Sequence, residues 1–258
     1  MSMRMRAACA AMVVGVFGVC ESAHAFSFSV EPSRIELSVP AGKQRGKTVR
    51  VSSRSDRPVH LKMYVQDVVF LPDGTSDFPA PGSTAWSCAK WITIIPDELD
   101  IPPGKTQEVR VSVAVPPETR GGSYAMVFFE SGPSYTEKGL GVNFRIGALT
   151  QVTVPNTEVY QAKLADLSVD SSRDVRVELF NEGNALIRPN GQLKVFDARN
   201  KKVWQQAFNI DRLGVLPKSP RSFHTTLGPL PKGSYRLKVE IDYGAKYLLG
   251  GERAFEIP

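Results

Sequence analysis

Residues 140–155 read LGVNFRIGALTQVTVP, and this stretch decides the fold that we predict for the chain. The even-numbered positions from Leu140 to Val154 are apolar apart from Thr150, whereas the odd-numbered positions include Asn143 and Arg145. Alternation with a period of two is typical of a strand with one dry face. Because a typical strand has about 5–6 residues, we expect the first part of this one to run beyond its own core along a sheet edge.

Shorter runs of Val, Ile, Phe, Tyr and Thr lie on both sides of this stretch, and Pro and Gly separate them. Such runs predict strands, and no amphipathic helix is evident. The expected strands before Pro155 are 28–39, 47–53, 59–70, 90–95, 108–115, 123–130 and 140–154. The expected strands after it are 161–169, 175–180, 191–196, 203–208, 222–226, 234–242 and 253–257. Residues 71–85 (LPDGTSDFPAPGSTA) are predicted to form a long loop.

Each half of the chain therefore holds seven expected strands, the number typical of an immunoglobulin-like sandwich of about 100 residues. We predict an all-β protein with two tandem immunoglobulin-like β-sandwich domains. The first domain is expected to cover residues 26–154 and the second residues 155–258, joined by a short hinge at Pro155. The halves share no repeated motif, so a solenoid array is not expected.

The first 25 residues are predicted to be a cleaved signal peptide. Arg4 and Arg6 precede an apolar run over residues 7–19, which ends near Ala23-His24-Ala25, the small-x-small pattern of a cleavage site. The mature chain would then begin at Phe26. The apolar run is shorter than the about 20 residues of a membrane-spanning helix. We therefore expect export to the periplasm and no membrane span.

Composition and charge narrow the function classes. The 258 residues are 42% apolar and 22% charged, which indicates an ordinary globular protein rather than a disordered chain. The formal charge is +6, and without residues 1–25 it is 30 basic minus 25 acidic residues, or +5. This excess is small and scattered, so we expect no nucleic-acid partner.

No pattern of catalytic or metal-binding residues stands out. The two histidines of the mature chain, His60 and His224, are 164 positions apart, and neither has the Cys or Glu spacing of a metal site. No Gly-x-Ser-x-Gly nucleophile motif is present. We therefore predict that the protein is not an enzyme and has no catalytic residue, metal or cofactor. Exported all-β proteins without such chemistry most often present surfaces or strand edges to partners.

Four further residues are assigned to packing. Cys88 is the only cysteine of the mature chain, so it has no partner for an intramolecular disulfide. A buried, inert side chain is favoured for it, with a reactive thiol as the alternative. Trp91, Tyr124 and Tyr243 are assigned to the core or to domain corners rather than to ligand binding.

Several strings resemble PapD-like periplasmic chaperones, which assist pilus assembly. In the first half they are Glu31-Pro32-Ser33-Arg34-Ile35, Trp91-Ile92 followed by Pro96 and by Ile101-Pro102-Pro103-Gly104, and VRVSVAVP at 109–116. In the second half they are Asn181-Glu182-Gly183-Asn184, Leu216-Pro217 with Ser219, and Asp242-Tyr243-Gly244. The resemblance thus extends over the whole mature chain, although each motif alone is short and common in immunoglobulin-like domains.

The resemblance implies two sandwiches whose cleft anchors the terminal carboxylate of a pilus subunit through two basic residues. Arg34 lies where the first anchor is expected, with an ordinary surface arginine as the alternative interpretation. The second anchor would be a lysine in the strand before Pro155, but that stretch reads ALTQVTV and its nearest basic residue is Arg145. A divergent or repurposed member of the family is therefore expected.

The preferred functional hypothesis is a periplasmic chaperone that binds and stabilises an incomplete pilus or fimbrial subunit by strand donation. Its partners would be that subunit and an outer-membrane usher. The predicted subunit-binding residues are Arg34, Leu140, Val142, Phe144 and Ile146. The alternative is an exported immunoglobulin-like structural or adhesive module without chaperone activity.

Overall fold

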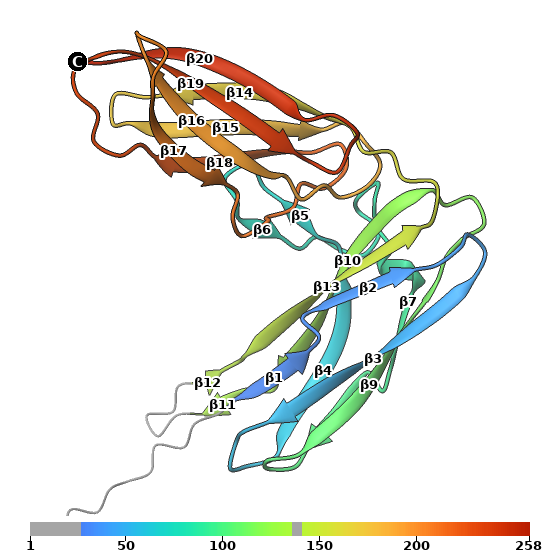
Figure 1. Cartoon of the computed structure of the whole chain (residues 1–258). Coiled ribbons are helices and arrows are strands. Elements are labelled where there is room, and N and C mark those ends of the chain that lie inside the picture. Colours follow the sequence, from blue (N-terminus) through green and yellow to red (C-terminus); the bar gives the residue numbers. More distant parts are fainter. Residues whose placement is uncertain (1–26, 136–140) are drawn as a thin grey trace, which may run out of the picture.

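The computed structural model describes residues 27–135 and 141–258, which form two β-sandwiches (Figure 1). No α-helix occurs in these two ranges, and a single 3-10 turn, η1 (Ala89–Trp91), precedes one strand. In the described part of the chain, no helix has the length and apolarity needed to cross a membrane. The predicted all-β, two-sandwich fold is confirmed, whereas the signal peptide predicted for residues 1–25 lies outside the described residues.

The first sandwich has one sheet of four strands and one of five. The four-stranded sheet has the order β1 (Phe28–Glu31), β3 (Gln44–Ser53), β9 (Thr106–Ala114) and β7 (Ile92–Ile95). The five-stranded sheet has the order β2 (Arg34–Ser38), β13 (Arg145–Val154), β10 (Gly121–Ser131), β4 (Val59–Gln66) and β8 (Glu98–Ile101). The β2–β13 pair is parallel, and the other pairs of both sheets are antiparallel.

The second sandwich packs a three-stranded sheet against a four-stranded one. The first has the order β14 (Ala162–Val169), β15 (Asp174–Asn181) and β18 (Pro220–Thr226). The second has the order β17 (Lys202–Phe208), β16 (Asn190–Asp197), β19 (Gly233–Asp242) and β20 (Leu249–Ile257). All seven strands predicted for this half are therefore present.

Each sandwich encloses its own apolar core because alternate residues of its strands face inward. Ile35, Leu61 and Phe129 are fully buried in the first core, and Leu179 and Leu237 in the second. Cys88 is also fully buried, as predicted, and burial raises the pKa of its thiol well above the ordinary value. It packs with Val113 and Trp91.

The strand predictions for the first half need correction at several points. The run 59–70 is not one strand, since β4 ends at Gln66 and Val69–Phe70 belong to β5. The run 28–39 forms two strands in different sheets, because Pro32 has no N–H for a ladder and separates β1 from β2. Residues 98–101 form β8, which was not predicted. Residues 71–85 are not a plain loop, since β5 (Val69–Phe70) and β6 (Ser76–Asp77) make a hairpin there.

Candidate partner-binding edge and junction of the sandwiches

The predicted strand 140–154 is divided in the structure. Residues 141 and 142 form β12 (Gly141–Val142), which pairs only with β11 (Ser134–Tyr135), and β13 begins at Arg145. Between them, Phe144 N–H donates to the side-chain oxygen of Ser131 at 3.0 Å, while Ser131 N–H donates to the carbonyl of Phe144 at 2.9 Å. Because the hydroxyl of Ser131, and not its backbone carbonyl, accepts the hydrogen bond from Phe144 N–H, the backbone hydrogen-bond ladder is interrupted at this point.

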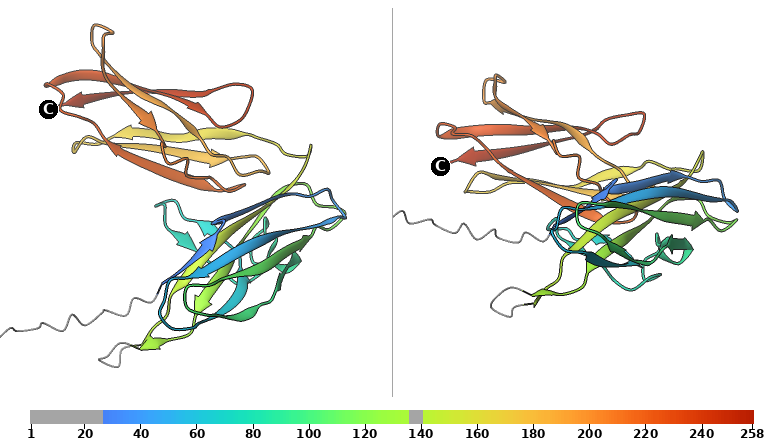
Figure 2. Two further views of the ribbon diagram at one scale, coloured as in Figure 1. Left: turned by 60° about the horizontal axis from the view of Figure 1, so that its bottom comes forward. Right: turned by 90° about the horizontal axis from the view of Figure 1, so that it is seen from below.

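The four predicted donor side chains are placed differently from one another. Leu140 lies outside the described residues. Val142 is half-buried in the β11–β12 hairpin, and Phe144 is 42% exposed. Ile146 is half-buried and packs against the core of the first sandwich. The β11–β12 hairpin lies at the end of the first sandwich that points away from the second one (Figures 1 and 2).

One edge of β13 is open over its first residues. The neighbouring strand β2 pairs with Leu149–Thr153, and within the described ranges no strand pairs with Arg145–Ala148 on that side. Along a strand, the backbone N–H and C=O groups of successive residues point to opposite edges. Those of Phe144 point to β10, whereas the carbonyl of Thr153 points to the β2 side, where it accepts a hydrogen bond from Val39 N–H. The N–H and C=O groups of Arg145 and Gly147 therefore point to the open edge.

Arg34 stands where this open edge ends. It is the first residue of β2 and lies opposite Leu149. Its side chain is exposed and makes no hydrogen bond or ion pair with residues in the described ranges. Glu36 is also exposed, whereas Ile35 between them is fully buried, so Arg34 and Glu36 share the outer face of the sheet.

Arg145 is held away from Arg34. Its guanidinium lies 4.3 Å from the ring centre of Phe128 and 5.8 Å from that of Phe78, and it donates to the hydroxyl of Tyr64 at 3.3 Å. Tyr64 in turn donates to Glu130 at 2.5 Å. Burial, followed by this hydrogen bond to Glu130, raises the pKa of Tyr64. Arg145 thus packs on an aromatic face and does not pair with Arg34 as a second anchor.

A basic residue does reach the sheet beside Arg34, but it comes from the second sandwich. Arg188 donates to the side-chain oxygen of Gln151 at 3.1 Å and to a carboxylate oxygen of Glu36 at 3.4 Å. Gln151 and Glu36 are partners in the β13–β2 register. We refer to Arg34, Glu36, Gln151 and Arg188 as the polar junction.

The two sandwiches also meet at an apolar junction, formed by Tyr124, Leu186, Leu216 and the segment 67–86. Tyr124 is fully buried, and its hydroxyl accepts a hydrogen bond from Leu186 N–H at 2.5 Å. Val68, Phe70, Phe78 and Trp86 of the segment pack in the same cluster. The predicted structural roles of Tyr124, Trp91 and Tyr243 are confirmed, since each packs in or against a core cluster.

The segment 67–86 is ordered around one carboxylate. Asp67 is fully buried and accepts hydrogen bonds from Gly82 N–H, from Thr84 N–H and hydroxyl, and from the Ser87 hydroxyl, at 2.5–3.1 Å. The hairpin reaches the second sandwich, where the carbonyl of Pro72 accepts a hydrogen bond from Ser222 N–H at 3.0 Å (Figure 2). Arg221 lies 5.3 Å from the ring centre of Phe70.

A shallow hollow of about 530 Å³ lies on the outer face of the five-stranded sheet. His60, Lys62, Tyr64, Glu130, Ser131 and Gly132 line it. His60 is bonded through one ring nitrogen to Asp100 at 2.9 Å and through the other to Glu98 at 2.8 Å. The hydrogen bond with Asp100, followed by that with Glu98, raises the pKa of His60.

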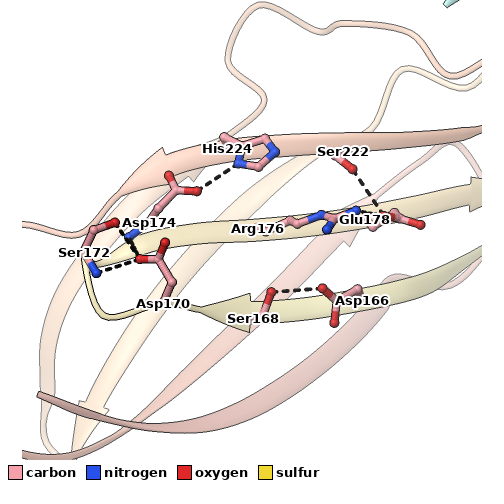
Figure 3. Close-up of polar contacts among 9 residues, drawn as sticks. All are labelled: Asp166, Ser168, Asp170, Ser172, Asp174, Arg176, Glu178, Ser222 and His224. Carbon is pink, nitrogen blue, oxygen red and sulfur yellow. Dashed lines mark hydrogen bonds and ion pairs between the residues drawn. The ribbon is translucent and has the colours of Figure 1, made fainter. Parts of the chain in front are cut away.

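The polar residues on the three-stranded sheet of the second sandwich do not assemble a nucleophilic triad (Figure 3). His224 Nδ1 lies 2.9 Å from Asp174, but the hydroxyl of Ser222 donates to Glu178 at 3.3 Å instead of to His224. No group of three or more potential metal-ligating side chains is found within residues 27–135 and 141–258.

No protein-family model matches the sequence, and no curated protein matches it. Among solved structures, the fold is similar to that of a chain from a chaperone–tip adhesin complex of CFA/I fimbriae biogenesis. That comparison has a TM-score of 0.51 and 16% identity, and it covers 88% of this chain and 98% of the other. The fold is also similar to the class 5 fimbriae chaperone CfaA, with a TM-score of 0.50, 17% identity, and coverage of 90% and 100%. The resemblance to PapD-like fimbrial chaperones is therefore confirmed as a likeness of fold over both sandwiches.

Proposed function

We propose that this protein is a periplasmic chaperone of the pilus or fimbria type, which stabilises an incomplete surface subunit by strand donation. The observation that carries the proposal is the open edge of β13 beside the exposed Phe144, on a fold similar to that of fimbrial chaperones. The similar chain from a chaperone–tip adhesin complex supports a pilus subunit as client. Residues 1–25 would direct export, and an outer-membrane usher is a second proposed partner.

The open edge supplies both backbone and side-chain contacts in this proposal. An added strand would bond to the N–H and C=O groups of Arg145 and Gly147 and would cover Val142, Phe144 and the exposed part of Ile146, with Leu140 as the next donor. Burying one such side chain contributes roughly 1.5–3 kcal/mol. Association costs about 4–15 kcal/mol, so the backbone hydrogen bonds must carry part of the affinity.

The position of Arg34 favours one orientation of the client strand. A strand that pairs with Arg145–Ala148 is collinear with β2, so it must end or turn where β2 begins at Arg34. A strand parallel to β13 would place its C-terminus at that point, whereas an antiparallel strand would place its N-terminus there. Because a guanidinium binds a carboxylate bidentately, Arg34 favours the parallel orientation and the terminal carboxylate of the client.

The first test is co-purification of a client from the native periplasm with the double variant Val142→Ser and Phe144→Ser. We expect the client to be lost, because the variant removes two of the proposed donor side chains, of which Phe144 is 42% exposed. The matched control is Val203→Ser with Ile210→Ser, which removes exposed apolar side chains from the second sandwich. Equal client recovery with both variants, at unchanged circular dichroism, would contradict strand donation and leave the adhesive module as the alternative.

A second pair of variants tests the backbone of the edge. Arg145→Ala removes the guanidinium alone, whereas Arg145→Pro also removes the N–H that points to the open edge; proline is tolerated at such an edge position. We expect the proline variant to capture clearly less client than the alanine variant at a similar melting temperature. Arg34→Ala should weaken capture as well, because it removes the proposed carboxylate contact.

A further inference from the structure

The β5–β6 hairpin belongs to the first sandwich but reaches the edge of the second. We call residues 69–77 the strap. Strand β18 is the last strand of its sheet, and the strap lies beside it where the two sandwiches meet (Figure 1). Among the described residues, a single backbone hydrogen bond joins the two, from Ser222 N–H to the carbonyl of Pro72 at 3.0 Å. Residues 71–77 are all exposed, so few contacts hold the strap to the second sandwich.

Arg221 lies beneath the strap, and its charge is buried without a counter-charge. The residue is 5% exposed and stands on the inner face of β18, opposite the fully buried Leu179. One guanidinium nitrogen donates to the carbonyl of Gly214 at 2.7 Å, whereas the buried Nε has no hydrogen-bond partner. Arg221 forms no ion pair with any residue of the described ranges. Buried charges in proteins are normally paired, so this arrangement is costly.

The strap itself removes water from Arg221. Only 3.9 Å separates its Nη2 from the position that a side chain at Gly74 would take, so the turn of the strap lies against the guanidinium. The ring centres of Phe70 and Phe223 lie 5.3 and 5.9 Å away, close to the limit of about 6 Å for a cation–π contact. Burial lowers the pKa of Arg221, as expected when a cation loses water and gains no anion.

We infer that the strap is a releasable contact between the sandwiches, which lifts from β18 while both sandwiches stay folded. The uncompensated charge of Arg221 keeps its closure weak, because lifting returns water to the guanidinium. The far end of the segment stays in place, since Asp67 accepts hydrogen bonds from residues 82–87. The closed strap limits movement between the sandwiches, and the lifted strap permits it. The inference is independent of the proposed function.

Hydrogen exchange of the Ser222 amide, followed by NMR on the full mature chain, measures lifting because the acceptor of this N–H belongs to the strap. The reference is Leu227 N–H, which bonds to the carbonyl of Arg173 at 2.9 Å within the second sandwich. After correction for intrinsic rates, we expect the Ser222 amide to exchange about tenfold faster or more. Equal exchange of the two amides would overturn the inference, because the strap would then open only on unfolding.

Arg221→Met reveals the sign of the charge effect. An apolar side chain of similar length needs no water, so the variant should slow exchange at Ser222 by about tenfold and leave Leu227 unchanged. If Arg221 instead clamps the strap through its ring contacts, exchange becomes faster; that result, or an equal slowing at both amides, would overturn the inference. Arg199→Met removes an exposed guanidinium from another turn and should match the wild type. If Arg221→Met fails to fold, the comparison of the two wild-type amides still decides.

A bound anion is the rival explanation for the missing counter-charge. Slower exchange at Ser222 in phosphate than in chloride buffer of equal ionic strength, absent from Arg221→Met, would show that the charge is compensated and would overturn the inference.

The movement is tested by electron spin resonance distances between labels at Thr48→Cys and Lys201→Cys, two exposed positions on different sandwiches; the native Cys88 is buried. Arg221→Met should narrow the distance distribution, and Phe70→Ala, which removes a ring from the strap, should broaden it. An unchanged distribution in both variants would contradict a role of the strap in limiting movement.

Discussion

The two junctions between the sandwiches differ in the way they are built. The apolar junction buries Tyr124 and Leu216 completely and is reinforced by a segment ordered around the buried Asp67. The polar junction consists of exposed and half-exposed side chains, and Arg188 contacts Gln151 at 3.1 Å and Glu36 at 3.4 Å. Buried packing contributes several kcal/mol and surface ion pairs contribute little. The comparison indicates that the apolar junction, rather than the polar one, fixes how the sandwiches meet.

The largest expected effect comes from breaking the apolar junction at Tyr124. Tyr124→Ala should lower the free energy of unfolding by about 3–5 kcal/mol, because it leaves a cavity where a large buried ring packed. Urea denaturation followed by tryptophan fluorescence measures this change. Tyr124→Phe keeps the ring and leaves Leu186 N–H without its acceptor, so its cost should be smaller, about 1–3 kcal/mol. Equal costs for the two variants would show that the ring contributes nothing.

The second effect concerns Asp67, which organises the segment that joins this junction. Asp67→Ala should cost about 2–3 kcal/mol, since four hydrogen-bond donors lose a buried acceptor. Limited proteolysis should then cut within residues 71–85. The control is Asp73→Ala in the same segment, where the exposed carboxylate bonds only to its neighbour Thr75. If Asp73→Ala is cut as readily as Asp67→Ala, Asp67 does not organise the segment.

At the polar junction we expect a much smaller effect on stability. Arg188→Gln should change the free energy of unfolding by about 1 kcal/mol or less, because its partners stay accessible to water. The same urea denaturation used for Tyr124 makes the comparison direct. A cost as large as that of Tyr124→Ala would mean that Arg188 also holds the sandwiches together.

The sequence predicts what is local in this fold and misses what depends on distant partners. Alternation is sufficient for the strands of the second sandwich and for the dry face of β13 from Ile146 to Val154. It does not show the break before Arg145, because the acceptor of Phe144 N–H is the hydroxyl of Ser131 on another strand. It also misses β8, since residues 98–101 lie among prolines and acidic residues that resemble a turn.

The same limit applies to the candidate site. Arg34 was found through a motif resemblance, and the structure places it at the end of the open edge. Arg188 gave no signal, because its partners Glu36 and Gln151 are 152 and 37 positions away and nothing in the surrounding sequence points to them. Asp67 was likewise hidden, because its donors become neighbours only when residues 82–87 fold back over it.

The smallest predicted effect concerns a second polar contact, which lies on the outer face of the first sandwich. His60 lies between Asp100 and Glu98, and these hydrogen bonds raise its pKa above the ordinary value of 6.5. A pKa that is higher in the folded state means that the charged form is stabilised by folding. The contribution is therefore complete below pH 6.5 and is lost as the pH rises through the folded-state pKa.

We expect His60→Gln to lower the melting temperature at pH 5.5 and to have almost no effect at pH 8.5. The gain at low pH should be about 0.5 kcal/mol or less, because the pair is exposed and screened by water. Differential scanning calorimetry of wild type and variant at the two pH values measures it. The double variant Glu98→Gln with Asp100→Asn removes both partners, so His60→Gln should then have no pH-dependent effect. A difference of the same size at both pH values would mean that His60 contributes through packing and not through its charge.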